Sequence, residues 1–216
     1  MDNLIISADD YGYAPAYDQG ILEAARAGAV DAVSIMVGRG PIDAASLLAT
    51  GVELGIHLEL ARGSSRADAE RQLQEFESAL GRPPAFLDGH HHCHAAPGIA
   101  GVIGQLAAEH RLIARSVDGS HRRLLRRLGV PTPELLVGRL REDEPAMPPE
   151  LESVMTGEGP PAAGVVEWMV HPGHTDRATG SAYDAGREQD LRLLLDLLDA
   201  GPLRSLRSTH AGALAA

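Results

Sequence analysis

The stretch NLIISADD, residues 3–10, joins a short apolar segment to two adjacent carboxylates, Asp9 and Asp10. A brief run of β-branched and other apolar residues that stops at polar residues predicts a buried strand. Three later segments repeat this arrangement, each with a histidine or aspartate where the apolar run stops: ELGIH up to His57, AFLDGH through Asp88 to His90, and VVEWMVH up to His171.

Segments with helical patterns alternate with these strands along the chain. Several helices begin near a proline and stop at a glycine, as helix ends commonly do. This alternation predicts an α/β fold with a parallel sheet. The expected helices are 15–28, 41–51, 66–81, 97–110 and 185–201; the expected strands are 3–7, 29–37, 52–60, 85–89, 112–117 and 164–170.

Residues 130–163 are rich in proline, glycine and acidic residues and show little periodicity. We expect some helix at 134–141 and a loop or lid over the rest. A strand–helix unit follows at 164–201, so this segment is not a domain boundary, and we expect residues 1–216 to form a single domain.

The carboxyl ends of parallel strands share one edge of a sheet, where ligands bind and catalytic residues project. Asp and His side chains from four strand ends therefore predict a metal site or an acid–base site. Taken singly, each residue has a simpler interpretation: Asp9 and Asp10 could cap the turn before Pro15, and a lone histidine is more often structural.

The run DGHHHCH, residues 88–94, contains four of the ten histidines. In an extended chain, Asp88, His90, His92 and His94 would point to one face, and His91 and Cys93 to the other. Side chains two residues apart on a strand are separated by ~6–7 Å, so this run can supply one or two ligands to an ion but not three. Asp88 then either orients a histidine ligand or caps the loop, and Cys93 is a small buried filler.

Composition narrows the class of protein. The chain has 19 basic and 30 acidic residues, a formal charge of −11, which argues against nucleic acid or anionic membrane as partners. The cluster RRLLRR, 122–127, is expected to be a solvated helix face. There is no apolar run of the ~18 residues that a membrane span needs and no signal-peptide pattern, so we expect a cytoplasmic location. A homodimer is compatible with the sequence.

The motifs LIISADDYG, GIHLEL, GRPPAFLDGHHHCH, HPGHTD and SAYDAGREQDL occur in this order along essentially the whole chain. As a set they resemble the YdjC-like carbohydrate deacetylase family. The resemblance implies a (β/α) barrel of the TIM type, a mononuclear divalent metal held by one aspartate and two histidines, and hydrolysis of N-acetyl groups on amino sugars or acetylated oligosaccharides. Because a full barrel takes ~250 residues, we expect a distorted or seven-stranded one.

The resemblance also assigns roles, position by position. It implies Asp10, His57 and His90 as the metal ligands, Asp9 as general base and His171 as general acid. His92, His94 and Tyr11 are expected in the substrate region, with Asp88 behind the ligands. Two imidazoles and one carboxylate suit zinc, and magnesium is the other expectation.

Two further functions remain open at this point. One is a different metallohydrolase, such as a phosphoesterase, which would need a second metal ~3.5–4 Å from the first and basic residues for phosphate. The other is a non-catalytic metal-binding or sugar-binding protein. Such a protein would need neither Asp9 nor His171.

Overall fold

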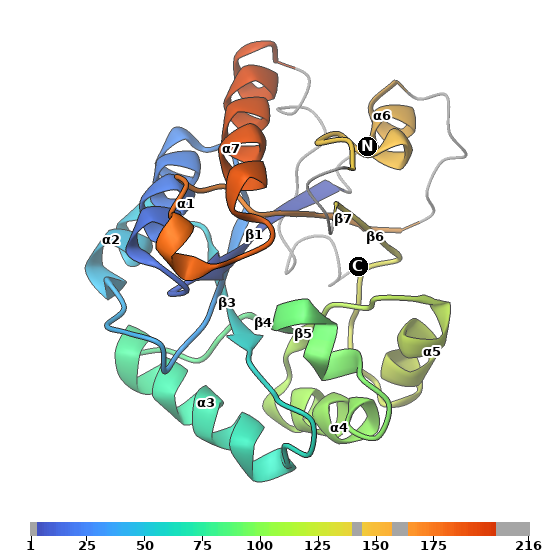
Figure 1. The fold of residues 1–216 in the computed structure, drawn as a ribbon. Coiled ribbons are helices and arrows are strands. Elements are labelled where there is room, and N and C mark those ends of the chain that lie inside the picture. Colours follow the sequence, from blue (N-terminus) through green and yellow to red (C-terminus); the bar gives the residue numbers. More distant parts are fainter. Residues whose placement is uncertain (1–3, 140–143, 157–163, 202–216) are drawn as a thin grey trace.

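The computed structural model describes residues 4–139, 144–156 and 164–201. Seven parallel strands form one sheet in the order β5-β4-β3-β2-β1-β7-β6, with β1 near the middle (Figure 1). The strands are β1 (Leu4–Tyr11), β2 (Ala32–Ile35), β3 (Glu53–Leu58), β4 (Phe86–Gly89), β5 (Ile113–Ala114), β6 (Leu135–Val137) and β7 (Val166–Val170). The expected α/β fold with a seven-stranded parallel sheet is confirmed.

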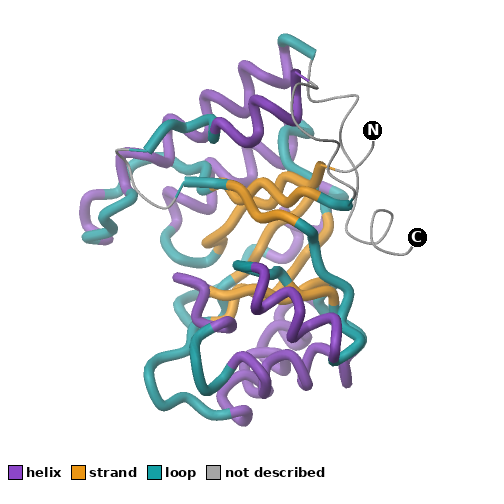
Figure 2. The backbone as a smooth tube through the Cα atoms, turned by 90° about the vertical axis from the view of Figure 1, so that its right-hand side faces the viewer, coloured by secondary structure: helices purple, strands orange, loops and turns teal. Residues whose placement is uncertain are grey.

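Helices connect the strands and lie on the outside of the curled sheet, as Figures 1 and 2 show from two directions. They are α1 (Pro15–Ala27), α2 (Ala44–Thr50), α3 (Arg66–Leu80), α4 (Ala100–His110), α5 (Gly119–Arg127), α6 (Pro149–Thr156) and α7 (Asp184–Asp199), with short 3₁₀ turns η1 (His90–Ala95) and η2 (Arg177–Thr179). Pro15 starts α1, and Gly28 ends it in the left-handed conformation that glycine adopts at no steric cost.

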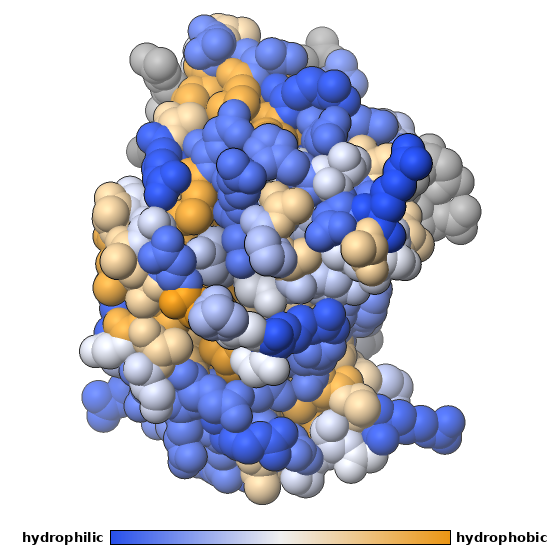
Figure 3. Space-filling model, turned by 60° about the vertical axis from the view of Figure 1, so that its left-hand side comes forward, coloured by the Kyte–Doolittle hydropathy of each residue, from blue (hydrophilic) through white to orange (hydrophobic). Residues whose placement is uncertain are grey.

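The sheet curls into a half-barrel in which β5 and β6 are the two outer strands. Within the described residues these two strands do not pair with each other, so the barrel stays open on that side. Strands β1, β2, β4 and β7 are buried along their whole length, which explains their continuous apolar runs. The largest fully buried side chain is Trp168 of β7. Hydrophilic residues cover most of the molecular face in Figure 3.

The expectation of a helix at 134–141 is wrong. Leu135, Leu136 and Val137 form β6, which pairs in parallel with Val166–Trp168 of β7. Pro131 and Pro133 precede this run and cannot donate helix hydrogen bonds, whereas a three-residue apolar segment can complete a neighbouring strand. The segment also contains helix α6, and its residues 140–143 and 157–163 lie outside the described part of the chain.

Among the described residues, no helix combines the length and the apolar character needed to cross a membrane.

The close approach of α1 to the loop after β7 gives a test of the packing. A Cβ at Gly20 would lie 2.5 Å from the Cα of Gly173, so Gly20→Ala should lower the free energy of unfolding by about 1–3 kcal/mol. Gly101→Ala in α4 is the matched control, because a Cβ there meets nothing within 4 Å. Helix propensity predicts that this control is neutral or stabilising by up to about 1 kcal/mol. Urea unfolding of both variants checks the difference, and equal losses would contradict this packing.

Candidate metal centre and active site

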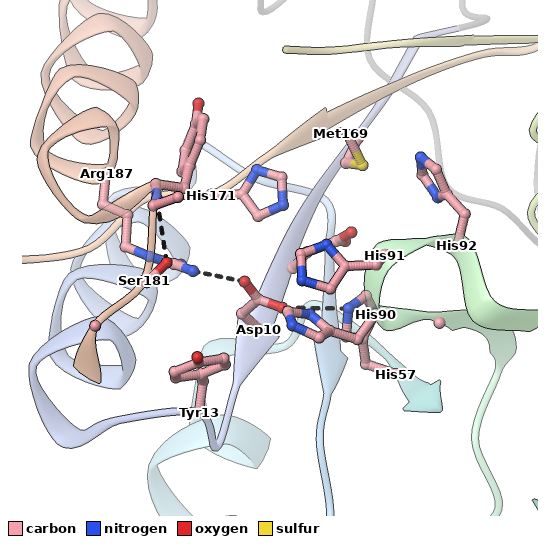
Figure 4. Close-up of a pocket in the computed structure, with 15 residues that line it drawn as sticks. Asp10, Tyr13, His57, His90, His91, His92, Met169, His171, Ser181 and Arg187 are labelled. Atoms are coloured by element: carbon pink, nitrogen blue, oxygen red, sulfur yellow. Dashed lines mark hydrogen bonds and ion pairs between the residues drawn. The ribbon is translucent and has the colours of Figure 1, made fainter. Parts of the chain in front are cut away.

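A cavity of about 850 Å³ opens at the carboxyl ends of the strands (Figure 4). It is lined by residues of β1, β3, β7, the η1 turn and the start of α7, and these elements are far apart in the sequence. Its lining residues are Asp9, Asp10, Tyr13, His57, Gly89, His90, His91, His92, Met169, His171, Gly180, Ser181, Ala182, Tyr183 and Arg187. Five expected site residues, Asp9, Asp10, His57, His90 and His171, therefore meet in one cavity, and His92 joins them.

Asp10 occupies an irregular position at the end of β1. The register between β1 and β2 shifts between Ala8 and Tyr11, and Asp10 has a φ of 72°, in the left-handed region. Such a bulge redirects side chains at the end of a strand, and aspartate tolerates this conformation better than most residues. Backbone strain of this kind is typical of functional sites.

Two imidazole nitrogens lie close to one oxygen of Asp10. His90 Nδ1 lies 2.8 Å and His57 Nε2 lies 3.2 Å from Asp10 Oδ1, and the three atoms lie within 4.8 Å of one another. Ligand atoms bound to one ion at about 2.0–2.2 Å are about 3.0–3.6 Å apart, so only small movements would let all three bind together. One carboxylate and two imidazoles are also a donor set that a divalent transition metal accepts.

Asp88 lies behind His57. Its Oδ1 is 2.7 Å from His57 Nδ1 and also accepts a hydrogen bond from Ser34. A carboxylate on one ring nitrogen of a histidine fixes the orientation of the ring and leaves the other nitrogen for a ligand. Here that other nitrogen, Nε2, faces Asp10.

The protonation of this cluster follows from its charges. Burial disfavours ionised Asp10, but hydrogen bonds from His57 and His90 outweigh it and hold the pKa of Asp10 well below its ordinary value. Burial likewise disfavours protonated His57, yet Asp88, Asp9 and Asp10 together keep the pKa of His57 well above 6.5. The carboxylates thus favour a positive charge at this position.

Arg115, which the sequence analysis missed, links the remaining carboxylates. Its guanidinium group is buried and contacts Asp9 through two hydrogen bonds of 2.5 and 2.8 Å, and it lies 2.8 Å from both Asp88 and Glu167. A second potential ligand group, Asp9, His57 and Asp88, lies in the same region. Arg115 already supplies a positive charge to both of its carboxylates, so the group around Asp10 is the better candidate for a metal site.

The total charge supports the same conclusion. Among the described residues, Asp190 and Arg139 form a buried pair that adds no net charge, and four further carboxylates, Asp9, Asp10, Asp88 and Glu167, are buried with two guanidinium groups, Arg115 and Arg187. At formal charges, and with neutral histidines, two negative charges remain. Buried charges need compensation, and one divalent cation would supply it.

The DGHHHCH run does not stay extended, which corrects the sequence expectation for it. Strand β4 ends at Gly89, and residues His90–Ala95 form the turn η1. His91 and His92 have φ values of 50° and 57°, an unusual conformation for non-glycine residues. As a result His90, His91 and His92 all line the cavity, whereas alternation had placed His91 on the opposite face.

The last two polar residues of the run point elsewhere. His94 does not line the cavity; it is buried, and its Nε2 lies 3.1 Å from the backbone oxygen of Arg115, to which it donates. Cys93 donates to the backbone oxygen of Leu58. Burial lowers the pKa of His92 to about 4 and that of His94 to about 3, so both are neutral near pH 7.

His171 follows β7 and faces the cavity next to Tyr183, with the two ring centroids 4.9 Å apart. Asp190 of α7 accepts hydrogen bonds from the backbone N–H of His171 at 2.9 Å and from the Tyr183 hydroxyl at 3.0 Å. Arg139, just after β6, pairs with the same carboxylate. Burial lowers the pKa of His171, which makes its protonated form a stronger acid than an exposed histidine.

The placement of Tyr11 corrects another expectation. Its side chain is 1% exposed and belongs to the hydrophobic core, and it does not line the cavity. The irregularity at Asp10 explains this: it interrupts the alternation of β1, so the neighbours Asp9 and Asp10 both line the cavity and Tyr11 points away from it. Tyr13 lines the cavity instead, with its ring 5.6 Å from that of His90.

Three arginines of the site were not anticipated. Arg115 and Arg139 follow β5 and β6, so the rule that selected Asp10 and His171 also identifies them when it is applied to basic residues. Arg187 lies within α7, where the pattern of an amphipathic helix does not distinguish it from a surface residue.

The buried neutral His94 predicts a specific pH dependence of stability. An unfolded histidine has a pKa near 6.5, so between about pH 3 and 6.5 the unfolded chain binds one more proton here than the folded chain. The stabilisation is complete above pH 6.5 and is lost as the pH falls. His94→Gln, which keeps a donor near the Nε2 position, should reduce the slope of stability between pH 4 and 6 by up to about 1.4 kcal/mol per pH unit. Urea unfolding in EDTA measures it, and an unchanged slope would contradict the assignment.

The family model for the YdjC-like protein matches residues 3–71 and 65–197. A carbohydrate deacetylase of Geobacillus stearothermophilus is 30% identical, over 89% of both chains, and a chitooligosaccharide deacetylase of Enterobacter sp. is 27% identical, over 90% of this chain and 91% of its own. A crystal structure of an Enterococcus faecalis V583 protein, to which cellobiose-phosphate cleavage has been ascribed, superposes with a TM-score of 0.77 over 97% of both chains at 22% identity, which shows a shared fold. The chain belongs to the YdjC-like family.

Proposed function

We propose that this protein is a metal-dependent deacetylase that hydrolyses N-acetyl groups of amino sugars or acetylated oligosaccharides. The observation that carries the proposal is the convergence of Asp10, His57 and His90 on one cavity that also contains Asp9 and His171. The relatives described as carbohydrate and chitooligosaccharide deacetylases supply the substrate class.

Asp10, His57 and His90 would hold the ion, which is zinc or magnesium. A divalent ion at such a site polarises a carbonyl group and makes a bound water molecule more acidic. The cavity of about 850 Å³ falls within the range of small-molecule sites, so it has room for a sugar beside the ligands.

Asp9 is the proposed general base. Arg115 holds both of its oxygens and fixes their orientation, and each carboxylate oxygen keeps a further lone pair that can accept a proton. His171 is the proposed general acid, which protonates the departing amine. Its backbone N–H is fixed by Asp190, and its ring faces the cavity beside Tyr183. His92, neutral at pH 7, can exchange hydrogen bonds with sugar hydroxyls.

Removal of the metal tests the first part of the proposal. Dialysis against EDTA should abolish acetate release from N-acetylglucosamine oligosaccharides, and Zn²⁺ or Mg²⁺ should restore it. Released acetate is measured directly, with 4-nitrophenyl phosphate as a parallel substrate. Unchanged activity in EDTA would overturn the metal requirement, and phosphate release without acetate release would favour a phosphoesterase. A chain that binds the ion and releases neither product would favour a non-catalytic protein.

Substitution of Asp9 tests the division of labour between the two aspartates. Asp9→Asn should retain the metal but lower kcat by about 10²–10⁴-fold, because the amide cannot take a proton. Metal content by elemental analysis and the melting temperature are measured beside turnover, since the change also weakens the contact with Arg115. Loss of metal in this variant would show that the roles of Asp9 and Asp10 are exchanged.

A further inference from the structure

Arg187 makes an unusual contact with the proposed metal site. This residue of α7 is 1% exposed, and its Nη2 donates to Asp10 Oδ2 at 2.6 Å. Its guanidinium carbon lies 3.7 Å above the ring centroid of Tyr17. Figure 4 shows the side chain entering from α7 and ending at the carboxylate of Asp10, opposite His90.

This placement is unfavourable for Arg187 itself. Its Nε and Nη1 atoms are buried and have no hydrogen-bond partner within the described part of the chain. Buried donors without partners cost free energy, and buried arginines usually satisfy theirs with several acceptors, as Arg115 and Arg139 do here. Arg187 retains one carboxylate and the rings of Tyr17 and, at 5.9 Å, Tyr13, so its contribution to stability is a poor explanation for its presence. Among the described residues, its charged contact is Asp10.

The contact divides the two oxygens of Asp10 between different partners. Oδ1 faces His57 and His90, and Oδ2 faces Arg187. The guanidinium group is held in place by Tyr17, whose hydroxyl bonds Thr179 at 2.6 Å and Asp184 at 2.9 Å. Asp10 can therefore offer one oxygen to an ion, while part of its negative charge is balanced from the other side.

We propose that Arg187 is a positioning residue that restricts Asp10 to a single ligand oxygen and withdraws negative charge from the ligand set. This inference rests on the proposed function, since it assigns a role at the same metal site. The consequence is that Arg187 weakens ion binding while keeping the bound ion more electron-poor. Because like charges repel in a buried site, removal of the guanidinium group should tighten ion binding and slow turnover. A purely structural arginine would show the opposite effect on binding.

The test measures ion affinity by calorimetry, as Zn²⁺ or Mg²⁺ is titrated into protein that has been treated with EDTA and then freed of the chelator. Arg187→Gln should bind each ion at least about tenfold more tightly than the wild type, with kcat for acetate release reduced at least tenfold. Arg187→Lys retains the charge and should bind within about threefold of the wild type. Equal or weaker binding by Arg187→Gln would overturn the proposal, as would an Arg187→Lys variant that binds as tightly as Arg187→Gln.

Two controls separate this effect from a loss of packing. Arg139→Gln removes another buried arginine–aspartate pair, one that does not contact the ligands, and should leave the ion affinity unchanged.

If Arg187→Gln does not fold, Tyr17→Leu removes the ring that supports the guanidinium group and should also tighten ion binding. Tyr17→Phe keeps the ring and should leave ion binding unchanged. Unchanged binding in Tyr17→Leu would overturn the proposal. A wild-type chain that binds neither ion would overturn the metal-dependent function itself.

Discussion

The site depends on the compensation of four buried carboxylates at one edge of the sheet. Asp9, Asp10, Asp88 and Glu167 are at most 2% exposed, and unpaired charges in such an environment are strongly unfavourable. Arg115 compensates part of this charge at Asp9, Asp88 and Glu167, and Arg187 compensates part of it at Asp10. The described residues therefore retain a local negative charge, which protons on histidines or a bound cation would neutralise.

The fold followed from local patterns, because alternation of apolar strands with amphipathic helices has few solutions. Parallel strands place their carboxyl ends on one edge, so the position of Asp10, His57 and His171 along the sequence was sufficient to bring them together. The expectation of a helix in segment 130–163 was wrong because β6 is only three residues long. Such a strand is too short for its alternation to be recognised in the sequence. Its pairing with β7, a long-range interaction, decides its conformation.

Prediction of the site was less complete, and the reasons are physical. The prediction that the histidine run is extended was wrong because two consecutive residues, His91 and His92, adopt left-handed backbone conformations and turn the chain. The residue types alone do not reveal this turn. The expectation for Tyr11 was wrong because a bulge at Asp10 interrupts the alternation of β1 and turns Tyr11 into the core. Arg187 reaches the site from a helix, so its role depends on tertiary packing of α7 against α1, for which the sequence offers no local signal.

The pair Asp9-Asp10 illustrates how two identical neighbours acquire different chemistry. Arg115 engages both oxygens of Asp9, whereas Arg187 engages only one oxygen of Asp10 and leaves the other facing two imidazoles. An ion at Asp9 would have to compete with a guanidinium group that three carboxylates hold in place. An ion at Asp10 would replace only hydrogen bonds between the carboxylate and two histidines. In the proposed function, the two arginines, rather than the aspartates themselves, would therefore decide which carboxylate is available as a ligand and which is left to act as the base.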